Sequence, residues 1–199
     1  MKLAVFGATG GTGRPLVAQA LERGHSITSF VRSTPKGDSL AGVDRVVTGD
    51  ARNTTAVGSA LRDVDAVVSA MGPKGPDTGT TYSDAIGTLV RTMEATDVRR
   101  VVISANSRVL DERPLEGPYA GVSQEHRDAL LGVRASGLDW TVVSTSMLSD
   151  DEPTGAYGAV IGAPAPGRSI SRADFATALL DALDHPEWSG LVVDVASAP

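Results

Sequence analysis

Cysteine is absent from the 199-residue chain, which excludes disulfides, thiolate nucleophiles and cysteine-ligated metals. Lysine is scarce, with only Lys2, Lys36 and Lys74. Aromatic residues make up 4% of the sequence, and no apolar run is long enough to span a bilayer. The net charge of −6 disfavours a broad polyanion-binding face. We therefore expect no membrane and no nucleic-acid partner.

The opening segment of the chain is typical of a first β-strand. Residues 1–6 are mostly apolar, run directly into glycines and lack a signal-peptide cleavage pattern, so the cytoplasm is the expected compartment. The length suits one well-buried α/β core and is short for two. We expect residues 1–199 to form a single domain that works as a monomer or a homodimer.

Short β-branched runs alternate with longer stretches of helical periodicity. Strands are predicted over residues 2–6, 26–31, 45–48, 66–69, 100–104, 140–144 and 191–195. Helices are predicted over residues 14–23, 54–62, 81–96, 123–135 and 172–183. Several strands are apolar throughout, as expected when helices cover both faces of a parallel sheet. The pattern predicts a Rossmann-type α/β domain with three α/β/α layers and a doubly wound parallel sheet.

A glycine-rich turn lies between the first predicted strand and the first predicted helix. Its sequence, Gly7-Ala8-Thr9-Gly10-Gly11-Thr12-Gly13, has the spacing Gly-x-x-Gly-x-x-Gly in the context that a dinucleotide-binding loop requires. Glycines permit a tight turn and close approach of a pyrophosphate, which the amides of the helix start attract. We predict cofactor contacts from Gly7, Thr9, Gly10, Gly11, Thr12, Gly13 and Arg14. A glycine-rich turn without a ligand is the alternative.

The residue that ends the second predicted strand indicates which dinucleotide binds. An NAD-binding domain usually places a carboxylate there for the ribose hydroxyl, whereas this chain has Arg32. A guanidinium matches a 2′-phosphate by bidentate hydrogen bonding, and Lys36 adds positive charge nearby. NADPH is therefore predicted in preference to NADH. A solvated surface arginine is the alternative interpretation.

Proline and glycine concentrate in irregular segments that we expect to shape a substrate pocket. These segments fall within residues 71–79, 106–126 and 146–167. Irregular chain near strand ends commonly forms the pocket of an open α/β sheet. Tyr119 and Tyr157 lie in these segments and are predicted to contact substrate. No metal is predicted, because the histidines and the acidic run at residues 150–152 lack ligand spacing.

Taken together, these motifs resemble the atypical short-chain dehydrogenase/reductase superfamily, in its NmrA-like branch that includes flavin reductase (biliverdin-IXβ reductase). The resemblance covers nearly the whole chain and extends to Gly49-Asp50 and to residues 134–138, 154–157 and 170–174. It implies that Asp50 and Ala51 border the adenine and that Ala70, Met71 and Gly72 line the cofactor. Ser104 and Asn106 would approach the nicotinamide, and Met147 completes the predicted cofactor contacts.

The acid–base pair typical of short-chain dehydrogenases is missing. That pair is Tyr-x-x-x-Lys, and Tyr119 is followed at this spacing by Ser123. Alcohol dehydrogenation by the usual mechanism is therefore disfavoured, whereas a conjugated acceptor needs less protein acid. Asn106, His126 and Ser104 are the catalytic candidates. His126 aligns with a histidine of the flavin-reductase pattern, while Asn106 occupies the position where the family is expected to have serine.

The sequence thus predicts an NADPH-dependent reductase that transfers hydride to a planar conjugated acceptor such as a flavin or a quinone. A non-catalytic NADP(H) sensor of the NmrA type suits the missing acid–base pair equally well. A sugar-nucleotide epimerase or dehydratase is disfavoured by the same absence.

Overall fold

The apolar β-branched runs form the strands of one central sheet in the computed structural model, which describes residues 1–33, 40–73, 75 and 79–198. The strand order is β3-β2-β1-β4-β5-β6-β10-β8. The bounds are β1 (Lys2–Phe6), β2 (Ser26–Val31), β3 (Arg45–Thr48), β4 (Ala66–Ser69), β5 (Arg100–Asn106), β6 (Asp139–Thr145), β8 (Tyr157–Ile161) and β10 (Leu191–Ser197). The first four strands begin and end at the predicted residues.

The strand order reverses between β1 and β4. Chain connections lead from β1 outward through β2 to β3, and then return to β4 on the other side of β1. Both neighbours pair with β1 in parallel, so that Phe6 lies opposite Phe30 on one side and Ser69 on the other. The connections leaving β1 and β4 therefore diverge and open a crevice at their carboxyl ends. The predicted Rossmann-type, doubly wound α/β domain is confirmed.

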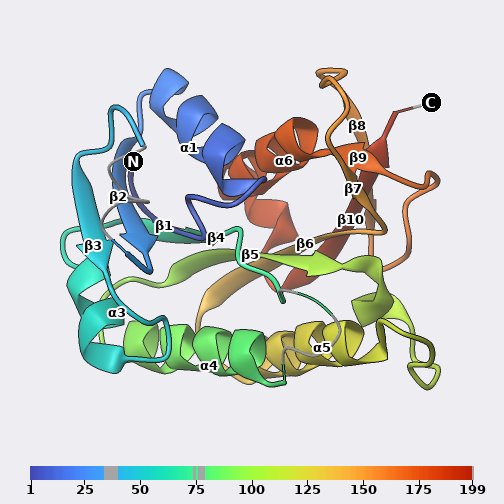
Figure 1. Cartoon of the computed structure of the whole chain (residues 1–199), viewed down its shortest axis with the longest axis horizontal. Helices are drawn as coiled ribbons and strands as arrows, with labels where there is room; N and C mark the ends of the chain where they lie inside the picture. Colours follow the sequence, from blue (N-terminus) through green and yellow to red (C-terminus); the bar gives the residue numbers. More distant parts are fainter. Residues whose placement is uncertain (34–39, 74, 76–78, 199) are drawn as a thin grey trace.

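Helices cover the sheet on both faces (Figure 1). One face carries α1 (Gly13–Glu22) and α6 (Arg172–Asp184), and the other carries α3 (Thr54–Ala60), α4 (Thr81–Glu94) and α5 (Ala120–Arg134). Two short 3-10 helices, η1 (Ser107–Leu110) and η2 (Pro186–Trp188), follow β5 and α6. No helix in the described part of the chain is long and apolar enough to cross a membrane.

One edge of the sheet departs from the prediction of a wholly parallel arrangement. β8 runs antiparallel to β10, with Tyr157 opposite Ser197. The segment expected to be irregular, residues 146–167, contains this strand and also β7 (Leu148–Ser149), which pairs with β9 (Ile170–Ser171). Gly155 and Gly162 have φ of 73° and 70° and form the turns at either end of β8. β8 was not predicted, because the glycine and proline around it are typical of a loop.

A buried carboxylate on β10 joins several elements at that side of the sheet. Asp194 of β10 is 1% exposed and accepts hydrogen bonds from the hydroxyls of Ser107 (2.6 Å) and Ser144 (2.5 Å) and from the amide of Ala165 (2.8 Å). These partners belong to η1, β6 and the segment between β8 and β9. One side chain therefore joins four parts of the chain, and its charge is satisfied by three donors.

Asp194→Ala is expected to lower the free energy of unfolding by at least about 3 kcal/mol, because three buried donors lose their acceptor. Urea denaturation followed by circular dichroism measures this loss. Asp151→Ala, a change at an exposed aspartate, is the control and should shift the free energy by less than about 0.5 kcal/mol. Equal stability of the two variants would contradict the role assigned to Asp194.

Candidate functional site

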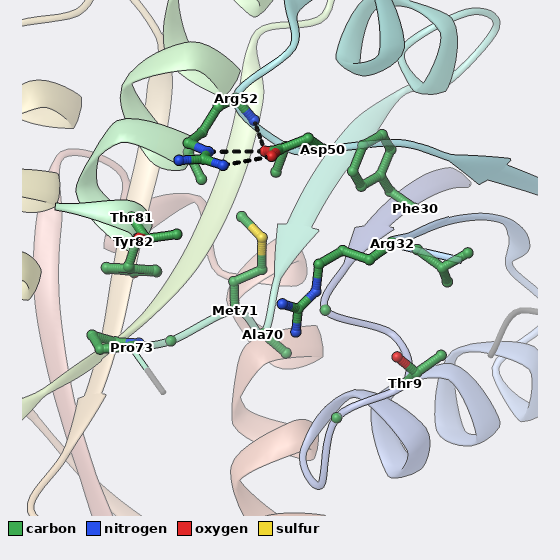
Figure 2. A pocket seen from close by; sticks show the side chains of 16 residues that line it. Thr9, Phe30, Arg32, Asp50, Arg52, Ala70, Met71, Pro73, Thr81 and Tyr82 are labelled. Atoms are coloured by element: carbon green, nitrogen blue, oxygen red, sulfur yellow. Dashed lines mark hydrogen bonds and ion pairs between the residues drawn. The ribbon is translucent and has the colours of Figure 1, made fainter. Parts of the chain in front are cut away.

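A cavity of about 540 Å³ opens at the carboxyl ends of β1, β2, β3 and β4, where the strand order reverses (Figure 2). Its wall combines backbone of the glycine-rich loop, apolar side chains and two arginines. The lining residues are Gly7, Thr9, Gly10, Phe30, Val31, Arg32, Asp50, Ala51, Arg52, Ala70, Met71, Gly72, Pro73, Thr81, Tyr82 and Ala85. Nine of the predicted cofactor residues are thus brought together around one space.

The glycine-rich loop has its shape because two of its glycines lie against backbone. Gly7 has φ of 79°, and a Cβ there would lie 2.8 Å from the carbonyl carbon of Ala70 at the end of β4. A Cβ on Gly13 would lie 2.0 Å from the carbonyl oxygen of Gly7. The amide of Gly10 donates to that same oxygen at 2.9 Å. Glycine is therefore required for the turn and for the close packing of α1 against it.

The other predicted loop residues lie beside the cavity rather than in its wall. Thr12 is the buried N-cap of α1, and Arg14 belongs to the first turn of that helix. Gly11 is covered by Arg172 of α6, since a Cβ on Gly11 would lie 2.8 Å from the side chain of that arginine. Arg172 in turn donates to Asp150 at 2.7 Å. Arg172 is therefore a second positively charged side chain close to the loop, in addition to Arg14.

Charged side chains line the cavity where β2 and β3 end. Arg32 follows β2, and Figure 2 shows its side chain reaching into the cavity. Asp50 follows β3 and accepts two hydrogen bonds from the guanidinium of Arg52, at 3.0 and 2.7 Å. These bonds lower the pKa of Asp50 to about 2, so its carboxylate stays ionised. Lys36, the other predicted phosphate ligand, lies outside the described residues.

Apolar groups form much of the remaining wall. Phe30 stacks on Phe6 with ring centroids 4.7 Å apart, which fixes the orientation of Phe30 beside the cavity. Ala51, Ala70 and Met71 add small and flexible apolar surface from the ends of β3 and β4. An apolar space with a few charged groups in its wall suits a base that carries phosphate. Sequence reasoning missed Phe30, Arg52 and Tyr82, because only the folded chain brings them to this wall.

Hydrogen bonds tie the cavity wall to β5 and to α5. The hydroxyl of Tyr82 donates to the carbonyl oxygen of Ser104 at 2.8 Å, and the hydroxyl of Ser104 donates to the carbonyl oxygen of Met71 at 2.7 Å. The carboxylate of Glu125 accepts from the amides of Tyr82 (2.6 Å) and Ser83 (3.0 Å) in the first turn of α4. Ser104 is therefore a link in the wall that holds Met71 and Tyr82 in place.

Two further catalytic candidates, Asn106 and His126, lie beyond Ser104. The amide nitrogen of Asn106 donates to the hydroxyl of Ser123 at 3.2 Å. His126 is buried, with its ring 4.8 Å from that of Tyr82. Burial lowers the pKa of His126 to about 4, so its imidazole is neutral at pH 7 and cannot act there as a protonated acid.

Three predicted contacts lie away from the cavity wall. Tyr157 directs its hydroxyl to Asp181 of α6 (2.7 Å) and packs against the core under α1 and α6. Tyr119 is 66% exposed at the start of α5, and Met147 is 56% exposed after β6. Among the described residues, no group of histidine, aspartate and glutamate side chains could hold a metal ion.

Comparison with known proteins identifies several that are similar to this chain. YwnB of Bacillus subtilis (strain 168), an uncharacterised protein, is 26% identical over 94% of each chain. The structure of SP1627 from Streptococcus pneumoniae TIGR4, whose name proposes an NADH-flavin reductase, superposes with a TM-score of 0.85 at 25% identity over 100% of both chains.

A third relative shares the fold and was solved with a nucleotide. This short-chain dehydrogenase/reductase of the wide type from Veillonella parvula DSM 2008, in complex with NADP, is 20% identical and has a TM-score of 0.81 over 98% of this chain and 94% of its own. A model of the NAD(P)H-binding family matches residues 7–186, a range that includes the glycine-rich loop and every residue of the cavity wall. The chain therefore belongs to the NAD(P)H-binding family.

Proposed function

We propose that this protein is an NADPH-dependent reductase of a planar conjugated acceptor, such as a flavin or a quinone, and that it works in the cytoplasm. The observation that carries the proposal is the cavity at the reversal of strand order, with an arginine at the end of β2. The name of SP1627 from Streptococcus pneumoniae supports the reductase assignment.

The residues of the cavity fit a dinucleotide with a 2′-phosphate. Its volume lies within the range of about 300–1,000 Å³ that is usual for small-molecule sites. Side chains at Gly7 and Gly13 would collide with neighbouring backbone and distort the loop against which the pyrophosphate would lie. Arg32 would bind the 2′-phosphate, with Asp50 and Ala51 at the adenine and Met71 toward the nicotinamide.

Binding and orientation are the chemical contribution of the chain's own residues. When bound, the nicotinamide supplies a hydride, and one proton from solvent completes the two-electron reduction of the acceptor. Neutral His126 does not deliver that proton at pH 7. The hydrogen bonds that join Ser104 to Met71 and Tyr82 would fix the part of the wall that lies beside the nicotinamide. Rate acceleration would then come mainly from proximity of the two planar rings.

A non-catalytic NADP(H) sensor is the second candidate. The missing Tyr-x-x-x-Lys pair suits it as well as it suits the reductase, because a sensor needs no acid–base group. Such a protein would use the same cavity and would bind the cofactor without consuming it.

Arg32→Asp is expected to weaken NADPH binding by about 10- to 100-fold, because a charge-assisted bidentate contact is replaced by repulsion. NADH affinity should change by less than about threefold. Isothermal titration calorimetry with both nucleotides measures the two effects. Arg134→Asp, at an exposed position of α5, is the matched control and should change neither. Equal losses for NADPH and NADH with Arg32→Asp would remove the 2′-phosphate assignment.

Turnover separates the reductase from the sensor. We expect the purified protein to oxidise NADPH when riboflavin, FMN or menadione is added, and to do so more slowly with NADH. Absorbance of the reduced nicotinamide follows the reaction. Tight NADPH binding without oxidation by any acceptor of a wide panel would establish the sensor instead.

The lowered pKa of His126 also predicts how stability depends on pH. An unfolded histidine titrates near 6.5, whereas the buried ring titrates near 4, so the unfolded state gains a proton first as the pH falls. We expect the free energy of unfolding to fall by about 2 kcal/mol between pH 7 and pH 5. Urea denaturation at both pH values measures this, and His126→Gln should show a flatter dependence. An NMR titration that gives His126 a pKa near 6.5 would contradict the assignment.

A further inference from the structure

The side chains at the start of α6 divide into two that hold the helix in place and one that faces the glycine-rich loop. The hydroxyl of Ser171 accepts a hydrogen bond from the amide of Asp174 at 3.0 Å. The carboxylate of Asp174 also accepts from two backbone amides just before β8, at 2.9 and 3.0 Å. The side chain of Arg172 does not join these contacts and extends toward Gly11 of the loop instead.

Arg172 lies directly over the glycine-rich loop. A Cβ on Gly11 would lie 2.8 Å from both Cδ and Nε of this arginine. Gly11 is not among the glycines with a positive φ, so its missing side chain leaves space for the arginine and is not needed for an unusual turn. Gly11 directly follows Gly10, which lines the cavity. The guanidinium of Arg172 therefore lies next to the cavity wall.

One ion pair holds the guanidinium in this position. Nη1 of Arg172 donates to Oδ1 of Asp150, just after β7, at 2.7 Å. The guanidinium makes no other hydrogen bond within the part of the chain that the structure describes. Its fork has further donors on Nε and Nη2, and the side chain is 31% exposed. A second anion can therefore reach the Nε–Nη2 edge.

The loop beneath Arg172 has donors of its own. The amides of Gly11 and Thr12 donate to no backbone acceptor among the described residues, and both precede the first residue of α1. Amides at a helix start attract negative charge, and a guanidinium fork matches the spacing of two phosphate oxygens. Backbone amides and a cationic side chain from a different helix thus lie at the same part of the loop.

We propose that Arg172 binds the pyrophosphate of the dinucleotide through Nε and Nη2, while Nη1 keeps its contact with Asp150. Arg172 would then serve the pyrophosphate as Arg32 serves the 2′-phosphate, and α6 would take part in cofactor binding although it contributes no residue to the cavity wall. This inference rests on the proposed function, because it adds a ligand for the cofactor named there.

Two nucleotides separate the roles of the two arginines. NADP⁺ contains both the 2′-phosphate and the pyrophosphate, whereas adenosine 2′-monophosphate contains only the former. We expect Arg172→Met to weaken NADP⁺ by at least about tenfold and to change adenosine 2′-monophosphate by less than about twofold. Isothermal titration calorimetry measures Kd for NADP⁺, and ligand-observed NMR measures the weaker binding of the monophosphate.

Three further variants give different signatures. Arg32→Asp should weaken both nucleotides, because both contain the 2′-phosphate. Arg172→Lys, which keeps the charge but not the fork, should lose less affinity for NADP⁺ than Arg172→Met. Arg168→Met removes one positive charge at an exposed position close in sequence and is the matched control, so it should leave both Kd values unchanged.

Arg172→Met should unfold at about the same temperature as the unaltered protein, because Asp150, the partner of the arginine, is 89% exposed and such ion pairs contribute little to stability. Thermal unfolding followed by circular dichroism checks this. A loss of NADP⁺ affinity in Arg172→Met is then a loss of contact with the ligand and not a loss of fold.

A change of less than about twofold in the NADP⁺ affinity of Arg172→Met would overturn the inference and leave the proposed function intact. Equal losses for NADP⁺ and adenosine 2′-monophosphate would also overturn it, because the arginine would then act without the pyrophosphate. Failure of the unaltered protein to bind NADP⁺ would refute the proposed function and this inference with it.

Discussion

The close approach of backbone to backbone at the glycine-rich loop is the constraint on which the rest of the structure depends. The carbonyl oxygen of Gly7 accepts a hydrogen bond from the amide of Gly10. The same oxygen occupies the space that a side chain on Gly13 would need. This contact lets α1 start directly beneath the turn, next to the end of β4. The floor of the cavity, the packing of α1 beside α6 and the position of Arg172 over Gly11 all follow from it.

Much of the fold could be predicted because the central strands are buried on both faces. A run such as Leu3-Ala4-Val5-Phe6 has no exposed side, and it makes up all of β1 except its first residue, Lys2. β8, a strand that was not predicted, lacks this signal. It is partly exposed, contains glycine and lies between two glycine turns, so its sequence is typical of a loop. The antiparallel pairing of β8 with β10 follows from contacts distant in sequence.

Residues of the candidate site could be predicted where they lie just after the ends of predicted strands. Arg32 and Ala70 come directly after strands and Asp50 comes two residues after one, and the parallel sheet brings such positions to one edge. Arg52 and Tyr82 were not predictable, since their places depend on the ion pair with Asp50 and on the packing of α4. The partner of Tyr157 was not predictable either, because a tyrosine beside glycines gives no indication that its hydroxyl donates to Asp181 on α6.

The cap that Glu125 provides at the start of α4 has a mechanical consequence. Glu125 belongs to α5 and lies one residue before His126. Its carboxylate accepts hydrogen bonds from two amides at the start of α4, the helix that carries Tyr82 to the cavity wall. A displacement of α5 therefore displaces the first turn of α4 as well. The position of Tyr82 in the cavity wall thus depends on a side chain of α5 that is more than 40 residues away in sequence and is not itself part of that wall.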